Sequence, residues 1–385
     1  MHLIGRKEHN LMGRQLKWTA AVALVAVCCL AACGTIAKLT TEQAVADSFS
    51  RLQNQSSLSV ALSVGLTPNE MATLSKRNGG SAIPANVANS LSKAAIVFSL
   101  STGHGESIKS KQAASDPANS YDVALRIGSS TPLEIRYVNQ TLYGRVQIAQ
   151  LVSDFGQSAS DGQSIQSALT KANQYVPGLA ALAAGRWVSV SKASLQSLMG
   201  MLKTFGGSLG GQSSSGSQSS PSNLNASVHQ LEGSLKNALK NNASFSNAGT
   251  SGGRTKYNVT LALKSFIEQA GPAIQTFASS IPGASGKITN ADISKLASEV
   301  PAHATAQLFV KNDKAQEIAV DLNQFVPANE KLPFAVPLQV VIGEPGAVSA
   351  PTGAAALNLS NLGQMVAGMM SGGFSSSSSS SVAAG

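Results

Sequence analysis

Residues 58–66, in the stretch SLSVALSVGLT, alternate strictly between large apolar side chains and small ones. The large residues share one side: Leu58, Val60, Leu62, Val64 and Leu66. Successive side chains of a β-strand point to opposite faces of a sheet, so this pattern predicts a strand with one buried face. The alternation alone leaves open whether that apolar face covers a solid core, a cavity or a ligand.

The same alternation returns in later segments and predicts a largely antiparallel sheet. Apolar residues alternate over 96–100, 121–127, 133–137, 257–263, 306–310, 318–322 and 336–342. The pairs Asn139-Gln140 and Asn312-Asp313 are predicted hairpin turns. We expect the charged residues that alternate within 121–137 to face water: Asp122, Arg126, Glu134 and Arg136. Pro337 cannot donate to a ladder, which favours an edge position for the last strand.

Helical spacing between these strands makes the predicted fold class α+β. A helix is expected from about Thr40, and others over 147–205, 223–239, 266–277 and 291–300. The segment 206–222 is rich in glycine and serine, and it reads either as a surface insertion or as a linker between two domains. We adopt a single domain over 41–350 with this insertion. An amphipathic segment at 351–370 and a disordered serine-rich tail at 371–385 follow.

The N-terminus predicts export and lipid attachment. Basic residues Arg14 and Lys17 precede the apolar run WTAAVALVAVCCL, which is too short to span a bilayer. The sequence LAAC, ending at Cys33, resembles the lipobox of bacterial lipoproteins. This resemblance implies that residues 1–32 are a signal peptide, that Cys33 carries the lipid anchor, and that 33–40 form a tether. The expected location is therefore extracytoplasmic, anchored to the cell membrane.

Net charge narrows the class of partner, and cysteine content limits which disulfides can form. The net charge is +9 with no block of adjacent basic residues, so a nucleic-acid partner is not expected, whereas anionic lipid headgroups are attracted. Cys28 and Cys29 lie in the predicted signal peptide, which leaves Cys33 alone in the mature chain. No intramolecular disulfide is then available, and the fold depends on its core.

We find no catalytic or metal-binding constellation in the sequence. Gly206–Gly210 matches G-x-S-x-G only within the glycine/serine segment, and Ser90 with Lys93 matches S-x-x-K without its companion motifs. His104, His229 and His303 have no second histidine or cysteine at ligand spacing. The sequence therefore predicts a protein that is not an enzyme and that has no cofactor or metal.

The order of elements resembles the actinobacterial lipoproteins of the LppX/LprG type, which are similar in fold to the lipoprotein carrier LolA. The residues that carry the resemblance are RYVNQTLYGRV and VSDFG, then KYNVTLALKSFIEQA and VPAHATAQLFVKNDKAQEIAVDL, spread over 41–345. The segment Pro68–Lys93, the glycine/serine segment and the C-terminal extension depart from that family.

The resemblance implies a curved antiparallel half-barrel whose concave apolar face is covered by helices and encloses a lipid or other hydrophobic ligand, with lipid transport across the envelope as a candidate role. The residues expected to line such a cavity are Leu58, Val60, Leu62, Val64, Phe98, Val123, Leu125, Ile135, Tyr257 and Leu261. The alternative is a structural or protein-interaction lipoprotein with a solid core and an unidentified envelope partner. A cavity above about 300 Å³ favours the first hypothesis.

Overall fold

The computed structural model describes residues 40–77, 83–110, 116–192, 194, 221–280, 288–326 and 330–359. These residues form two compact units. Unit 1 contains the described residues up to 116 and those from 221 to 347, and unit 2 contains those of 117–194 and 348–359. The predicted α+β class is confirmed. Residues 206–220 of the glycine/serine segment lie outside the described residues, and its last two residues begin a helix of unit 1.

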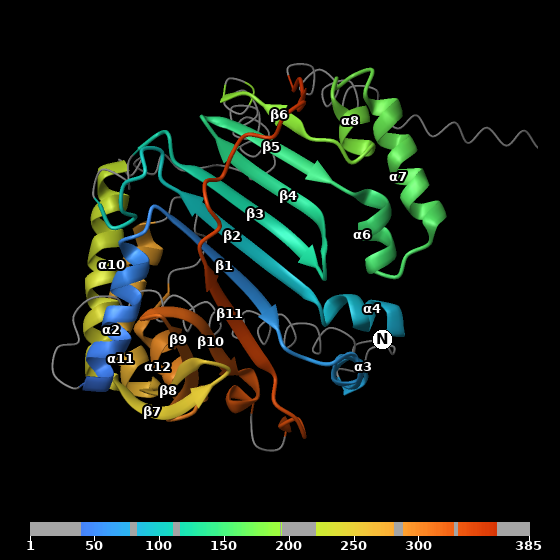
Figure 1. The fold of residues 1–385 in the computed structure, drawn as a ribbon. Coiled ribbons are helices and arrows are strands. Elements are labelled where there is room, and N and C mark those ends of the chain that lie inside the picture. The colour runs from blue at the N-terminus through green and yellow to red at the C-terminus, as the bar shows by residue number, and fades with distance from the viewer. Residues whose placement is uncertain are drawn as a thin grey trace, which may run out of the picture. The chain divides into compact units, whose positions relative to one another are not determined.

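The sheet of unit 1 has the strand order β2-β1-β11-β10-β9-β8-β7, and each neighbouring pair is antiparallel (Figure 1). Its strands are β1 (Ser57–Val64), β2 (Ala94–Ser101), β7 (Ala243–Ser251), β8 (Arg254–Ala262), β9 (His303–Lys311), β10 (Lys314–Asp321) and β11 (Pro337–Gly343). Asn312 and Asp313 both have positive φ, as the predicted tight turn between β9 and β10 requires.

The expected edge position of the last strand is wrong, because β11 lies between β1 and β10. Pro337 is the first residue of β11, so its missing N–H falls at the end of the ladder. Its carbonyl oxygen still accepts a hydrogen bond of 2.7 Å from the Gly65 amide.

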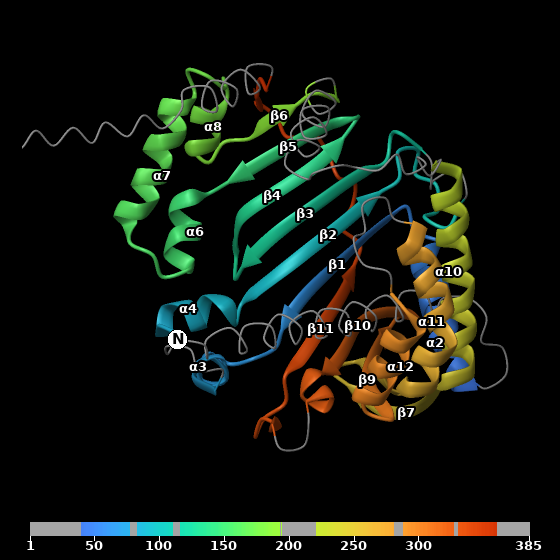
Figure 2. The same ribbon diagram turned by 180° about the vertical axis from the view of Figure 1, so that it is seen from behind.

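The helices of unit 1 gather mostly at one end of its sheet. They are α2 (Thr40–Gln53), α3 (Pro68–Arg77), α4 (Ala85–Leu91), α10 (Pro221–Asn242), α11 (Leu263–Ser280), α12 (Asn290–Glu299) and the 3₁₀-helix η1 (Leu322–Phe325). Both views place α2, α10, α11 and α12 beside β7–β10 (Figures 1 and 2). A capping box between Thr289 and Asp292 begins α12.

Unit 2 has the strand order β12-β6-β5-β4-β3, which is antiparallel except for the β12–β6 pair. Its elements are β3 (Ser120–Ile127), β4 (Ser130–Val138), β5 (Thr141–Val146), α6 (Ile148–Asp154), α7 (Ala159–Ala172), α8 (Leu179–Ala183), β6 (Val188–Val190) and β12 (Ala355–Ala356). The predicted turn at Asn139-Gln140 is confirmed, because both residues have positive φ.

Residues 348–359 form a C-terminal strap across unit 2 (Figure 1). Arg136 of β4 donates a hydrogen bond of 3.1 Å to the Ser349 carbonyl. Further along, the amide of Ala355 donates to the Trp187 carbonyl and that of Leu357 to the Ser189 carbonyl, which attaches the strap to β6 as β12. Gly178 permits this close approach, because a Cβ there would lie 2.6 Å from the Ala356 oxygen.

Candidate functional site: an apolar sheet face and its pocket

One face of the unit 1 sheet is apolar from end to end. The strand register places Phe98 opposite Val60, Val60 opposite Ile342, and Ile318 opposite both Val340 and Leu308. The residues on this face, which we call the unit 1 apolar face, are Ile96, Phe98, Leu100, Leu58, Val60, Leu62, Val64, Leu338, Val340, Ile342, Ile318, Val320, Ala304, Ala306, Leu308, Tyr257, Val259, Leu261, Ala243 and Phe245. The alternation seen in the sequence therefore becomes a single surface.

Helices cover this face over β7–β10. Val45, Phe49 and Leu52 of α2 are buried in one cluster with Leu308 and Val320. A second cluster joins α10, α11 and α12 to the ends of β8 and β9, and Phe266 at its centre is fully buried. This part of the face forms an ordinary hydrophobic core.

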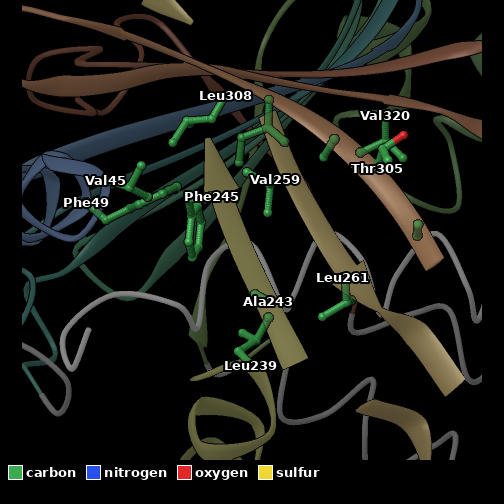
Figure 3. A pocket seen from close by; sticks show the side chains of 13 residues that line it. Val45, Phe49, Leu239, Ala243, Phe245, Val259, Leu261, Thr305, Leu308 and Val320 are labelled. Carbon is green, nitrogen blue, oxygen red and sulfur yellow. The ribbon is translucent and has the colours of Figure 1, made fainter. Parts of the chain in front are cut away.

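An apolar pocket remains inside the covered part (Figure 3). Its volume is about 60 Å³. Figure 3 shows Val45 and Phe49 of α2 extending toward Phe245, with Leu239 of α10 beside Ala243. Thr305 is the one residue with a polar side chain among those that line it, which are otherwise Val45, Phe49, Leu239, Ala243, Phe245, Val259, Leu261, Ala304, Ala306, Leu308, Ile318 and Val320. A site of this composition suits a hydrocarbon group.

The unit 1 apolar face is open over β1 and β2. Phe98 is 44% exposed and Ile96 46% exposed, although their neighbours across the register are aliphatic. The predicted lining residues of β1 are all half-buried: Leu58, Val60, Leu62 and Val64. Large apolar side chains left in water on a continuous surface are typical of a binding site.

The ten predicted lining residues thus divide by location. Leu261 lines the pocket, and Tyr257 is buried in the core beside it. Leu58, Val60, Leu62, Val64 and Phe98 lie on the open part of the same face. Val123, Leu125 and Ile135 belong to unit 2. The sequence predicted a helix from about Thr40 but no lining residue within it, so the α2 residues of the pocket, Val45 and Phe49, were missed.

In unit 2 the expected orientation of the sheet is wrong. Tyr121, Val123, Leu133 and Ile135 share one face and are exposed. Glu134, on the opposite face, is only 5% exposed, and Asp122 and Arg136 beside it are half-buried. The charged face is therefore the buried one, because its charges neutralise one another and the C-terminal strap crosses it. Arg126 is exposed as expected.

Glu134 is the centre of this charged cluster. Its Oε1 accepts from Arg136 Nη2 at 2.5 Å and its Oε2 from Arg145 Nη2 at 2.7 Å. Both guanidinium groups also lie over the Trp187 ring, at 4.9 and 5.0 Å from its centroid. Burial, followed by the repulsion of Glu134, raises the pKa of Asp122. Two arginines balance the charges of Glu134 and Asp122, which favours a structural role, although Asp122 Oδ1 and Arg145 Nε are buried without a hydrogen-bond partner among the described residues.

The two histidine side chains in the described part of the chain belong to different segments, the loop after β2 and the start of β9. His104 Nδ1 lies 2.7 Å from Asp116 Oδ2, and this hydrogen bond raises the pKa of His104. His303 is exposed at the start of β9. The side chain of His229 and the motif at Gly206–Gly210 lie outside the described residues, and Ser90 and Lys93 fall at the end of α4.

In the described part of the chain, no three His, Cys, Asp or Glu side chains come together in a group able to hold a metal ion. Of the helices described, none has the length and hydropathy needed to cross a bilayer. The predicted signal peptide, Cys33, most of the tether and the tail at 371–385 lie outside this part of the chain. No protein-family model matches the sequence, and a search of curated proteins finds no match.

Proposed function

We propose that this protein is a non-enzymatic, membrane-anchored extracytoplasmic lipoprotein that binds a lipid or other hydrophobic ligand on the unit 1 apolar face. The observation that supports this most strongly is the continuity of that face. It begins as an open apolar surface on β1 and β2 and leads, across β11 and β10, to an apolar pocket. We take the curved half-barrel with a helical cover as the matching fold, in which the sheet bends around the ligand.

The pocket volume limits how much of a ligand the pocket can hold. About 60 Å³ is well below the roughly 300 Å³ of a site for a drug-sized molecule. The pocket therefore takes the end of one alkyl chain, and the remainder of the ligand lies along the open residues of β1 and β2. Only two strand spacings, about 10 Å, separate β10 at the pocket from β1.

The N-terminal anchor fits this arrangement. With Cys33 acylated, the tether reaches at most about 25 Å before α2 begins at Thr40. Because α2 supplies Val45 and Phe49 to the pocket, the ligand site stays close to the membrane from which a lipid would come. Labelling with a radioactive fatty acid tests the anchor: we expect incorporation in the parent chain and none in Cys33→Ser, and labelling of both would contradict it.

Ligand binding is tested by filling the pocket. Ala306→Phe places a ring in the pocket, whereas Gln307→Phe places the same ring on the opposite, solvent-exposed face of β9. A long-chain fatty acid should raise the melting temperature of the parent protein and of Gln307→Phe, because a ligand that binds only the folded state stabilises it. Ala306→Phe should lose this shift. The proposal fails if the fatty acid shifts none of the three proteins, or shifts all three equally.

The second candidate function is the interaction lipoprotein with a solid core. The small pocket volume and the exposed apolar residues of unit 2 favour it. Native mass spectrometry of protein extracted from its own membrane separates the two. A non-covalent ligand that Ala306→Phe no longer retains supports the first, and a parent protein free of ligand supports the second.

A further inference from the structure

The apolar face of unit 2 is uncovered over β3 and β4. Tyr121 is 44% exposed and Ile135 41%, and the Tyr121 and Tyr137 rings lie 6.3 Å apart on this face. The residues of this surface, which we call the unit 2 apolar patch, are Tyr121, Val123, Leu125, Leu133, Ile135 and Tyr137. Four of them are 38–44% exposed, which is costly for a contiguous apolar surface.

The C-terminal strap leads the chain to this patch. Its early part contacts the charged face of the sheet through the bond between Arg136 and the Ser349 carbonyl. It then joins β6 as β12, and Leu359 is buried with Val190 and Val176. Val190 lies opposite Leu142, which lies opposite Tyr137 of the patch. The strap therefore passes around the β6 edge and arrives, at Leu359, on the face that carries the patch.

Residues 360–370, which follow the strap, have the composition expected of a segment that covers the unit 2 apolar patch. The sequence SNLGQMVAGMM, residues 360–370, has no charge, and it lies outside the described residues. Its large apolar residues recur at helical spacing: Leu362, Met365, Val366, Met369 and Met370. Methionine adapts to irregular apolar surfaces, and a helix this short needs a partner surface to be stable in water.

The length of this segment as a helix also matches the distance from β6 to β3. Eleven residues in a helix extend about 16 Å. From β6 to β3 there are three strand spacings, about 14 Å. We propose that residues 360–370 pack as an amphipathic helix across the unit 2 apolar patch, with Leu362, Met365, Val366 and Met369 facing Tyr121, Val123, Ile135 and Tyr137. The serine-rich residues 371–385 then extend beyond the sheet.

Hydroxyl-radical footprinting of the full chain tests this proposal directly. We expect the oxidation of Tyr121 and Tyr137 to rise several-fold in the double variant Met365→Asp/Met369→Asp, because the charges displace the helix. The matched variant Ser360→Asp/Gln364→Asp adds the same charge on the opposite side of the helix and should oxidise like the parent. Equal oxidation in all three proteins would overturn the proposal.

The same measurement separates other occupants of the patch. Protection in the parent that appears only at high protein concentration indicates a second copy of the chain, and protection that appears only with anionic vesicles indicates a membrane surface. Either result overturns the proposal.

An engineered disulfide gives an independent test that does not depend on whether the aspartate variants fold. With Cys28, Cys29 and Cys33 replaced by serine, the pair Ile135→Cys and Val366→Cys should form an intrachain disulfide under mild oxidation. The pair Ile135→Cys and Gln364→Cys should not, because its second cysteine points away from the sheet. Equal bridging of both pairs would contradict a fixed helix.

Discussion

The two units use the same alternating strands in opposite ways. In unit 1 the part of the apolar face over β7–β10 is buried against α2 and α10–α12, and large residues such as Leu308 and Val320 are only 2% exposed. In unit 2 the apolar side chains of β3 and β4 are exposed, while Glu134 on the other face is buried between two arginines. Alternation therefore identifies which residues share a face, but the elements packed on the sheet decide which face is buried.

The difference also shows two ways of stabilising a sheet. Unit 1 relies on apolar burial, which needs no directional contacts. Unit 2 relies, at Glu134, on ion pairs and ring contacts that must be satisfied together. Mutations in the two units should consequently differ in size and in their dependence on pH.

The largest expected effect is in the covered part of unit 1. Leu308→Ala removes a side chain that packs beneath α2, so we expect a loss of about 4 kcal/mol in the free energy of unfolding. Phe98→Ala, on the open part of the same face, should cost under about 1 kcal/mol because Phe98 is already in water. Urea denaturation measures both, and similar losses would show that β2 is covered as β9 is.

Much of the fold follows from the sequence for a physical reason. The period of two in 58–66 and 257–263 matches the geometry of a strand, and Asn139-Gln140 and Asn312-Asp313 tolerate the positive φ of a tight hairpin turn. These are local properties, so each segment carries its own evidence. The class α+β followed from them directly.

The errors concern what lies above each sheet, which no single segment encodes. Glu134 was expected in water because charged residues alternate along its strand, yet Arg136 and Arg145 neutralise it on the buried face, and Trp187 packs against both guanidinium groups. The pocket was missed at Val45 and Phe49 because α2 and β10 are far apart in sequence. Pro337 was misplaced because its effect on a ladder depends on its position within the strand.

The second prediction tests the charged core of unit 2. Glu134→Gln leaves Arg136 and Arg145 close together without their shared anion. The Glu134 side chain is only 7% exposed, so the lost charge is a buried one. We expect a loss of about 3 kcal/mol, at the lower end of the range for buried pairs because both arginines are partly exposed. Chemical denaturation at neutral pH gives the value.

Unit 1 supplies the matched control for that substitution. Glu317 accepts a bond of 2.5 Å from Arg254, whose guanidinium lies over Phe309, but Arg254 is its one arginine partner among the described residues, and Glu317 is more exposed than Glu134. Glu317→Gln should cost no more than about 1 kcal/mol. Equal losses at Glu134 and Glu317 would mean that the cluster in unit 2 is no more than a surface ion pair.

The smallest effect is expected at Asp122, the second acid of the cluster. Its Oδ1 is buried without a hydrogen-bond partner among the described residues, and Arg136 Nε is 3.8 Å away. Since folding raises the pKa of Asp122 above its ordinary 3.8, the ionised carboxylate destabilises the folded state. The stability that the neutral form provides is present below that ordinary pKa, and it is lost as pH rises through the higher folded value.

Asp122→Asn stays neutral at every pH, so its free energy of unfolding should match that of the parent near about pH 3 and exceed it at neutral pH. The gain should be smaller than the losses expected for Leu308→Ala and Glu134→Gln. Urea denaturation of both proteins across this range measures the difference. A difference that stays constant with pH would assign the effect to packing, and an Asn variant that is weaker at neutral pH would show that the ionised carboxylate pairs with Arg136.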